Sequence, residues 1–399
     1  MRSRNTAGAR LKAPQGQLDL PFLLLVLLLM AVGLLMMFSA SYAQSYRDHD
    51  SSTFYFKRQL LFATVGIAAM LLLSKIRYEL WRKFALPILI GAGALMVLVI
   101  AFGLTAKGAQ RWIELGSVQF QPSEIAKFAV VVWFAAIGAQ SREKMQDIRY
   151  VGKMLAFPLA IVLALTMLER HLSATIIILA IGCILAFLAG AKKKWLAWVL
   201  LGALVLAALA IAAEELLYAK SGGDASQMPY FMRRIVAWLH TWDMQNQSDV
   251  SYQVVQSLYA VGSGGFLGLG FGLGRQKYLY LPEEHNDYVF AIGCEELGLV
   301  GAAVILLLFM LLILRGYWIA LHAKNRFSSL LVSGLTTLLA LQVVLNIAVV
   351  TNLIPATGIS LPFFSYGGTA LMMQLGEMGI ILNVSRECGN SVLGTEAEQ

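Results

Sequence analysis

Long apolar blocks separated by short polar connections run through the whole sequence. Most blocks contain about 20 residues, which is the length that an α-helix needs to cross the hydrocarbon core of a bilayer. We therefore predict about ten transmembrane helices, of which the second and fifth are short. The expected spans are residues 18–42, 58–74, 84–103, 122–139, 155–168, 172–190, 195–213, 286–314, 328–352 and 361–384.

Composition supports a membrane protein and excludes a soluble enzyme, a disordered chain and a coiled coil. Hydrophobic residues make up 58% of the 399 residues and charged residues 14%, whereas soluble proteins contain roughly 45–50% apolar and about 25% charged residues. The predicted fold class is all-α and polytopic, with one membrane domain over residues 1–399. The first apolar run is too long for the core of a cleaved signal peptide, so we interpret it as a retained span.

The distribution of Lys and Arg predicts the orientation of the chain, because short cytoplasmic loops carry an excess of these residues. The cations of this chain, whose formal net charge is +8, gather in the N-terminal tail and in every second connection. Both tails, 1–17 and 386–399, are therefore expected in the cytoplasm, and the connection 214–285 is expected to be a large extracytoplasmic loop. Nucleic-acid binding is not indicated, because it needs a continuous basic face or tail.

The large loop contains two stretches of helical character and a glycine-rich segment. Residues 228–242 mix aromatic side chains with Arg233 and Arg234, a composition typical of a helix in the headgroup plane. Residues 251–261 carry apolar positions at helical spacing. The glycines of 262–274 favour neither helix nor strand, and they match neither the dinucleotide-binding nor the P-loop pattern. We interpret this segment as a flexible re-entrant turn, or as backbone that approaches a bulky ligand.

Charged side chains follow the glycines directly. Arg275 and Lys277 are suited to contact phosphate. Asp287 then stands where the apolar run of the eighth span begins, and partial desolvation there would make its carboxylate a better general base near neutral pH. His285 is suited to bind a metal or relay a proton, although a lone histidine is more often structural.

The other polar residues of this acidic cluster have a simpler explanation. Asn286 or Glu284 is most readily interpreted as the N-cap of the eighth span, since such residues commonly begin a helix.

Several charges lie within or beside the predicted spans, where they are costly and usually face a cavity or a partner. Glu295 and Glu296 follow the acidic cluster in the eighth span. Glu124 and Lys127 in the fourth span have the i, i+3 spacing of an ion pair on one helical face. Arg111, in the preceding outer loop, is expected near the same mouth.

The last outer loop, residues 355–369, contains two prolines, three glycines and no charged residue. Non-helical backbone at membrane depth must be buried in protein or line a cavity, so we expect this loop to shape a groove. Ser365 has no His or Asp partner nearby in the sequence, which argues against its being a nucleophile.

Four blocks of the sequence together resemble the SEDS family (shape, elongation, division and sporulation), typified by FtsW, RodA and SpoVE. The second and third blocks are long and specific, and with the ten-span layout the resemblance covers nearly the whole chain. The division or sporulation branch is favoured over the elongation branch. The blocks are KGAQRWIELGSVQFQPSEIAKF (107–128), SYQVVQSLYAVGSGGFLGLGFGLGRQKYLYLPEEHNDYVFAIGCEELGLVG (251–301), PATGISLPFFSYGGTA (355–370) and the basic short loops.

The resemblance implies a peptidoglycan glycosyltransferase that polymerises lipid II at the outer face of the bacterial cytoplasmic membrane. It further implies work beside a class B penicillin-binding protein and other division proteins. The essential carboxylate of the family falls on Asp287, and Arg111, Glu124 and Lys127 match its polar positions. His171 stands where many members have an aspartate, which puts any role of that acid in doubt. The full substrate-binding set that we predict is Arg111, Lys277, Arg275, Glu124, Lys127, His285 and Ser365.

Glycosyl transfer from a lipid diphosphate needs a base for the attacking hydroxyl and positive charge for the leaving group. Asp287 is the predicted base, and Arg233 or Arg234 is a further source of positive charge. A divalent cation, Mg²⁺ or Mn²⁺, is compatible with this chemistry, although no cofactor follows from the sequence. Two other functions remain open: a transporter that flips lipid II, since buried charges suit transport, and a non-catalytic scaffold for the transpeptidase.

Overall fold

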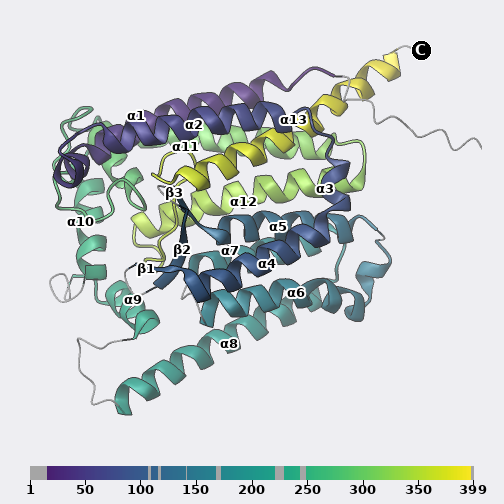
Figure 1. The fold of residues 1–399 in the computed structure, drawn as a ribbon, viewed down its shortest axis with the longest axis horizontal. Helices are drawn as coiled ribbons and strands as arrows, with labels where there is room; N and C mark the ends of the chain where they lie inside the picture. The colour runs from purple at the N-terminus through teal and green to yellow at the C-terminus, as the bar shows by residue number, and fades with distance from the viewer. Residues whose placement is uncertain are drawn as a thin grey trace, which may run out of the picture.

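Long helices lie side by side in the computed structural model, and short connections join them at the two ends of the bundle (Figure 1). The structure describes residues 16–106, 109–115, 118–140, 142–167, 172–220, 229–242 and 249–396. Within these residues, six helical segments are long and apolar enough to cross a membrane. They are Leu20–His49, Phe54–Leu73, Glu79–Phe102, Lys193–Leu216, Val289–Leu321 and Arg326–Val350.

Every span expected from the sequence coincides with a helix. The long helices are α1 (Leu20–His49), α2 (Phe54–Leu73), α4 (Ala85–Phe102), α5 (Pro122–Gly138), α6 (Ile148–Met167), α7 (Leu172–Leu188), α8 (Lys193–Lys220), α11 (Val289–Leu321), α12 (Arg326–Val350) and α13 (Gly368–Glu396). Shorter helices connect them: α3 (Glu79–Lys83), the 3₁₀ turn η1 (Lys144–Gln146), α9 (Tyr230–Leu239) and α10 (Asp249–Ser263). Helices α9 and α10 confirm the two helical stretches predicted in the large loop.

The boundaries differ most at the last span. Helix α13 begins at Gly368, whereas the apolar pattern placed the start of the span at residue 361. Residues 361–367 instead belong to the non-helical loop that precedes the helix, because Pro362 and the following glycines interrupt regular backbone.

One small sheet accompanies the helices, and the sequence did not predict it. Residues 104–120 contain a small antiparallel sheet of β1 (Leu104–Ala106), β2 (Ala109–Leu115) and β3 (Val118–Phe120), in the order β1-β2-β3. Trp112 pairs with Leu104, and Ile113 pairs with Phe120. Aromatic and β-branched residues favour such strands. The sheet leads into Pro122 at the start of α5 and so carries Arg111 towards the first turn of that helix.

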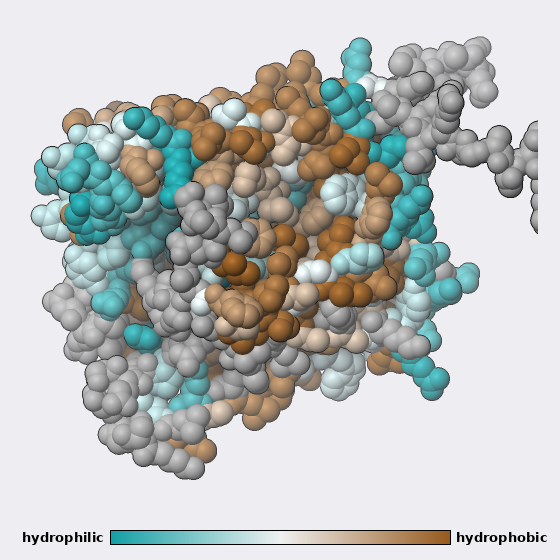
Figure 2. All heavy atoms as spheres, in the orientation of Figure 1, coloured by the Kyte–Doolittle hydropathy of each residue, from teal (hydrophilic) through white to brown (hydrophobic). Residues whose placement is uncertain are grey.

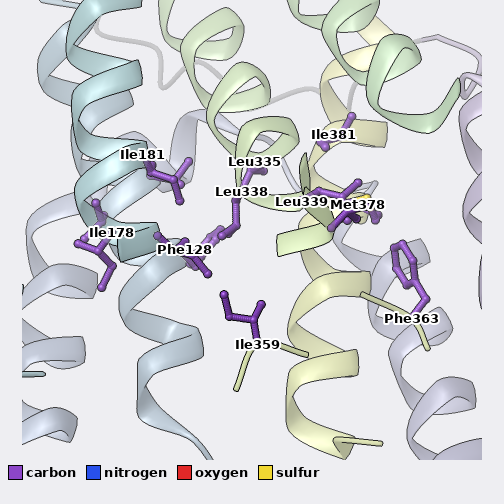
Figure 3. Packing of buried hydrophobic residues seen from close by; sticks show 14 of the residues in the cluster. Phe128, Ile178, Ile181, Leu335, Leu338, Leu339, Ile359, Phe363, Met378 and Ile381 are labelled. Atoms are coloured by element: carbon purple, nitrogen blue, oxygen red, sulfur yellow. The ribbon is translucent and has the colours of Figure 1, made fainter. Parts of the chain in front are cut away.

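The core lies between helices that are distant in sequence. Phe128 of α5 packs with Ile178 and Ile181 of α7 and with Leu335 and Leu338 of α12 (Figure 3). Apolar atoms form a broad band on the surface, and polar atoms gather towards the two ends of the bundle (Figure 2). This pattern is the one expected of a chain whose flanks contact lipid and whose ends contact water.

Helix α11 is broken near its start, and the glycine-rich segment fills the break. Gly298 has φ 67° and ψ −168°, a conformation open almost only to glycine. The backbone N–H groups of Leu269 and Gly270 donate to the carbonyls of Glu295 and Glu296, each at 3.0 Å. A Cβ on Gly268 would lie 2.2 Å from the Glu296 carbonyl oxygen. Glycine at this position therefore allows the segment to pack closely against α11.

Candidate active site

A cavity of about 650 Å³ opens at the end of the bundle that carries the sheet and the loop before α11. Segments from nearly the whole chain line it, including the α1–α2 junction, β2, the first turns of α5 and α7, α9 and the loops before α11 and α13. The cavity thus brings together side chains that the sequence places far apart. Among the predicted site residues, its lining includes Asp287, Arg111, Glu124, Lys127, His285 and Ser365.

Asp287 lies in the cavity wall, one residue before the N-cap Tyr288 of α11. Its side chain lies close to Gly358: a Cβ there would meet the Asp287 Oδ2 atom at 3.2 Å. Behind the wall, the buried Asn346 of α12 donates from Nδ2 to the carbonyl of Asp287 at 2.8 Å and to the carbonyl of Ile359 at 2.6 Å. One amide therefore joins the two loops between which the carboxylate lies.

Further hydrogen bonds hold these two loops together. The Ser365 hydroxyl donates to the Asn286 carbonyl at 2.6 Å and accepts from the Leu361 N–H at 2.7 Å. The Tyr366 N–H donates to the His285 carbonyl at 2.8 Å. The Ser365 hydroxyl is thus engaged with backbone on both sides, which assigns it a structural role in shaping the cavity.

The N-cap interpretation of the acidic cluster is wrong. Tyr288 occupies the N-cap of α11, and no side chain caps this end. Asn286 instead donates to the Glu283 carboxylate at 2.6 Å. Glu284 is buried, with its Oε1 atom 3.7 Å from His285 Nδ1.

Positive charge lines the cavity from three separate elements. Arg111 comes from β2, Arg234 from α9 and Arg58 from α2. Arg234 donates from Nη1 to the Ala356 carbonyl, which ties α9 to the last outer loop. Burial raises the pKa of the nearby Tyr366 phenol, while the Arg58 guanidinium acts in the opposite direction. Arginine clusters of this kind are suited to bind phosphate groups.

The ion pair predicted in the fourth span is confirmed. Lys127 Nζ donates to Glu124 Oε1 at 2.7 Å, and both side chains are at most one tenth exposed. They line the cavity at the start of α5. Glu377 of α13, which the sequence analysis did not single out, is buried and interacts electrostatically with both. A compact group of opposite charges therefore lies beside the cavity, and Glu124 and Lys127 are its cavity-lining members.

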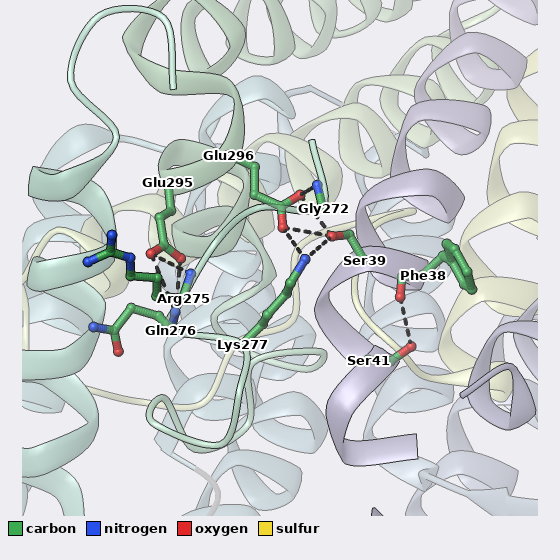
Figure 4. A network of polar contacts seen from close by, with 9 residues as sticks. All are labelled: Phe38, Ser39, Ser41, Gly272, Arg275, Gln276, Lys277, Glu295 and Glu296. Atoms are coloured by element: carbon green, nitrogen blue, oxygen red, sulfur yellow. Dashed lines mark hydrogen bonds and ion pairs between the residues drawn. The ribbon is translucent and has the colours of Figure 1, made fainter. Parts of the chain in front are cut away.

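Lys277 and Arg275 do not line the cavity. Lys277 is buried and donates to Glu296 Oε1 at 2.7 Å and to the Ser39 hydroxyl at 3.0 Å (Figure 4). Arg275 is exposed, and its backbone N–H donates to Glu295 Oε1 at 2.8 Å. The two intramembrane glutamates have partners, as predicted, but these partners are the loop backbone, Ser39 and Lys277.

A divalent cation fits the cavity only if the substrate supplies part of its coordination. Among the residues that the structure describes, no three His, Cys, Asp or Glu side chains are grouped as metal ligands. Mg²⁺ commonly binds through one or two carboxylates together with substrate phosphates, and Asp287 and Glu283 both line the cavity. His171, the departure from the family pattern, lies outside the described residues.

Several cavity residues were missed by the sequence analysis. The sequence did not single out Arg58, Tyr55, Tyr366, Gln342 or Gln374, all of which line the cavity. A polar residue within an apolar block is a usable signal, and it would have identified Gln342 and Gln374. No sequence signal distinguishes Tyr55 from the tyrosines that commonly lie at membrane interfaces.

Comparison with known proteins identifies the same family that the sequence motifs resemble, along almost the whole chain. The pattern of the family described as "Cell cycle protein", whose named members are FtsW, RodA and SpoVE, matches residues 19–390. A "Probable peptidoglycan glycosyltransferase FtsW" from Geobacter sp. (strain M18) is 37% identical, over 92% of this chain and 96% of the relative. "Stage V sporulation protein E" from Bacillus subtilis (strain 168) is also 37% identical, over 92% and 97%.

Solved structures have a similar fold. A chain in "Structural coordination of polymerization and crosslinking by a peptidoglycan synthase complex" matches with a TM-score of 0.72 and 25% identity, over 93% of this chain and 98% of that chain. The crystal structure of the rod shape determining protein RodA from Thermus thermophilus matches with a TM-score of 0.67 and 25% identity, over 93% and 97%. Sequence pattern, relatives and fold agree, and the chain belongs to the FtsW/RodA/SpoVE family of multi-pass membrane proteins, the SEDS family.

Proposed function

We propose that this protein is a peptidoglycan glycosyltransferase that polymerises lipid II at the outer face of the cytoplasmic membrane, in cell division or sporulation. The observation that carries the proposal is the position of Asp287, in a cavity of about 650 Å³ that three arginines also line. One carboxylate and several cations are what transfer from a sugar diphosphate needs. A relative named as a probable peptidoglycan glycosyltransferase supports the activity, and a relative named as a sporulation protein supports a role in sporulation.

In the proposed reaction, a sugar hydroxyl of one glycan attacks the anomeric carbon of another. Asp287 takes the hydroxyl proton as the new C–O bond forms. The bond from the anomeric carbon to the diphosphate breaks, and the lipid diphosphate leaves with the electron pair. Arg111, Arg234 and Arg58 offset its charge. A single displacement of this kind inverts the anomeric centre. A bound divalent cation would add positive charge at the diphosphate.

The orientation is part of the same proposal. The ten long helices that coincide with predicted spans form the membrane bundle, with both termini in the cytoplasm and residues 214–285 outside it. The connection that contains α3 lies at the end of the bundle opposite the small sheet (Figure 1). Basic connections such as this one are expected in the cytoplasm. This supports a position of the cavity at the outer face, where lipid-linked substrate would be accessible.

A membrane-anchored transpeptidase of the class B penicillin-binding type is the proposed partner. Support comes from the similarity to a chain whose structure is named for a peptidoglycan synthase complex that coordinates polymerisation and crosslinking.

The test is polymerisation of labelled lipid II by detergent-solubilised protein together with its partner. Wild-type protein should produce glycan chains, and the Asp287→Asn variant should produce none while keeping its unfolding temperature. A lipid II flippase would form no polymer in this assay, because flipping needs two compartments. A scaffold would bind its partner equally well with or without Asp287. Full polymerase activity of Asp287→Asn would remove the assignment of the base.

A further inference from the structure

Five aromatic rings from three separate segments meet along one side of the cavity. We call this group the aromatic wall: His49, Phe54 and Tyr55 from the α1–α2 junction, His285 from the loop before α11, and Tyr366 from the loop before α13. All five line the cavity. The sequence alone does not indicate that these five rings meet.

The rings contact one another continuously. His49 stacks on Phe54 with centroids 3.6 Å apart, and Tyr55 stacks on His285 with centroids 5.0 Å apart. Phe54 and Tyr366 each meet Tyr55 edge-on, at 5.6 Å and 5.0 Å. The Tyr55 hydroxyl donates to Asp48 Oδ2 at 3.0 Å, which holds that ring in place. The wall is therefore oriented before any ligand binds.

Burial separates this wall from ordinary core packing. Phe363 and Phe364, a few residues before Tyr366, are each 1% exposed, whereas Phe54, Tyr55 and Tyr366 are only half-buried and border the cavity. Tyrosines of the membrane interface lie elsewhere: Tyr42 and Tyr46 of α1 are 45% and 63% exposed and do not line the cavity. Half-exposed rings on the inside of a polar cavity are poorly explained by core packing or by contact with lipid.

A pyranose ring has the surface that such a wall fits. One face of the sugar presents C–H groups, which are attracted to the negative face of an aromatic ring. Its rim presents hydroxyl groups, and the charged groups beside the wall, Arg58, Glu283 and Asp287, are suited to bind them. An acyl chain would gain apolar contact with the rings, but it would offer no hydrogen-bonding group to the charged side chains beside them.

We propose that the aromatic wall is a carbohydrate-stacking subsite, in which a pyranose ring of the glycan lies flat on the wall and turns its hydroxyl edge towards Asp287. The inference rests on the proposed function, since it names the part of the substrate that this side of the cavity takes. Tyr55 is the central ring, because it contacts His49, Phe54, His285 and Tyr366. Arg111 and Arg234 then remain for the diphosphate.

The experiment compares Tyr55→Leu with Tyr46→Leu, which removes an exposed ring of α1 outside the cavity. Loss of one aromatic contact should raise the KM for lipid II roughly three- to tenfold in Tyr55→Leu. The KM of Tyr46→Leu should stay at the wild-type value. Tyr55→Phe keeps the ring and should raise the KM less than Tyr55→Leu. Tyr366→Leu repeats the test in a different segment, and unfolding temperatures identify any variant that has not folded.

A second measurement separates this proposal from the proposed function. The ligand is a tail-free disaccharide of N-acetylglucosamine and N-acetylmuramic acid. In saturation-transfer NMR, wild-type protein should transfer saturation to the C–H protons of the sugar rings. Tyr55→Leu should lose that signal. If wild-type protein forms no polymer but shows this ring-dependent signal, the activity is wrong and the subsite stands. If Tyr55→Leu and Tyr366→Leu have wild-type KM values and wild-type disaccharide signals, the wall does not bind sugar.

Discussion

Replacing Lys277 by methionine tests whether this cation belongs to the substrate site or to the fold. The Lys277 side chain is 3% exposed and its partner Glu296 is 0% exposed. Removing one member of such a buried pair costs about 3–5 kcal/mol, because the remaining charge loses its counter-ion. Glu296 would keep the Ser39 hydroxyl at 2.7 Å and the Gly272 N–H at 3.0 Å. We therefore expect a loss near the lower limit, about 3 kcal/mol.

The double variant Lys277→Met/Glu296→Gln removes both charges together. A glutamine carbonyl can still accept from Ser39 and Gly272, and replacing a buried pair by neutral groups is often nearly neutral. We expect the double variant to recover most of the lost stability. Because Lys277 lies outside the cavity, polymerase activity should recover with it.

The assay combines unfolding in detergent with polymerisation of lipid II. Arg275→Met is the matched control for stability, since that neighbouring side chain is exposed and surface substitutions usually change stability by less than about 0.5 kcal/mol. A double variant that is as stable as wild type but inactive would refute our reasoning, because it would show that the Lys277 charge acts on substrate. A single variant as stable as wild type would refute the energetic argument.

Two other substitutions act at opposite ends of the bundle. Gly358→Ala should reduce polymerase activity at least severalfold, because a Cβ at this position would meet Asp287 Oδ2 at 3.2 Å. The φ of 72° also strains an alanine, so stability should fall by about 1–2 kcal/mol. Steady-state rates of the folded variant measure the first effect, and wild-type activity would contradict the close approach. Asn325→Ala should lower stability by about 1 kcal/mol and leave activity unchanged, because Asn325 caps α12 through reciprocal hydrogen bonds with Ser328. Chemical unfolding measures the loss of stability, and an unaltered midpoint would show that the cap contributes nothing.

Much of the site could be predicted from the sequence because charged side chains within apolar segments are energetically unfavourable. Asp287 and the Glu124–Lys127 pair lie at or within apolar runs, and a charge in such a place needs a cavity or a partner. The same reasoning correctly indicated that Glu295 and Glu296 have partners. It could not decide whether Lys277 binds substrate phosphate or forms an ion pair within the protein. A lysine that pairs with a buried carboxylate cannot be distinguished by sequence from a lysine that binds phosphate.

Contacts between distant segments explain the remaining differences. The aromatic wall joins residues from the α1–α2 junction to His285 and Tyr366, and no local pattern records that these rings meet. The small sheet at 104–120 is too short to interrupt the apolar pattern of the spans. The break in α11 at Gly298 is stabilised by hydrogen bonds to the backbone of residues 265–270. Because these partners lie outside the helix, the continuous apolar run of α11 gives no sign of the break.

Apolar block length and the placement of Lys and Arg were sufficient to establish a polytopic helical membrane protein and the approximate limits of its helices. Both properties are local, because each helix must satisfy its own backbone hydrogen bonds in lipid. Which charges face the cavity, which pair within the fold and which rings border the site were decided only by packing. Helices α2, α5 and α13 and the two outer loops bring these groups together. Contacts with other segments, such as that of Lys277 with Glu296 of α11, determine whether a charge belongs to the fold or to the cavity.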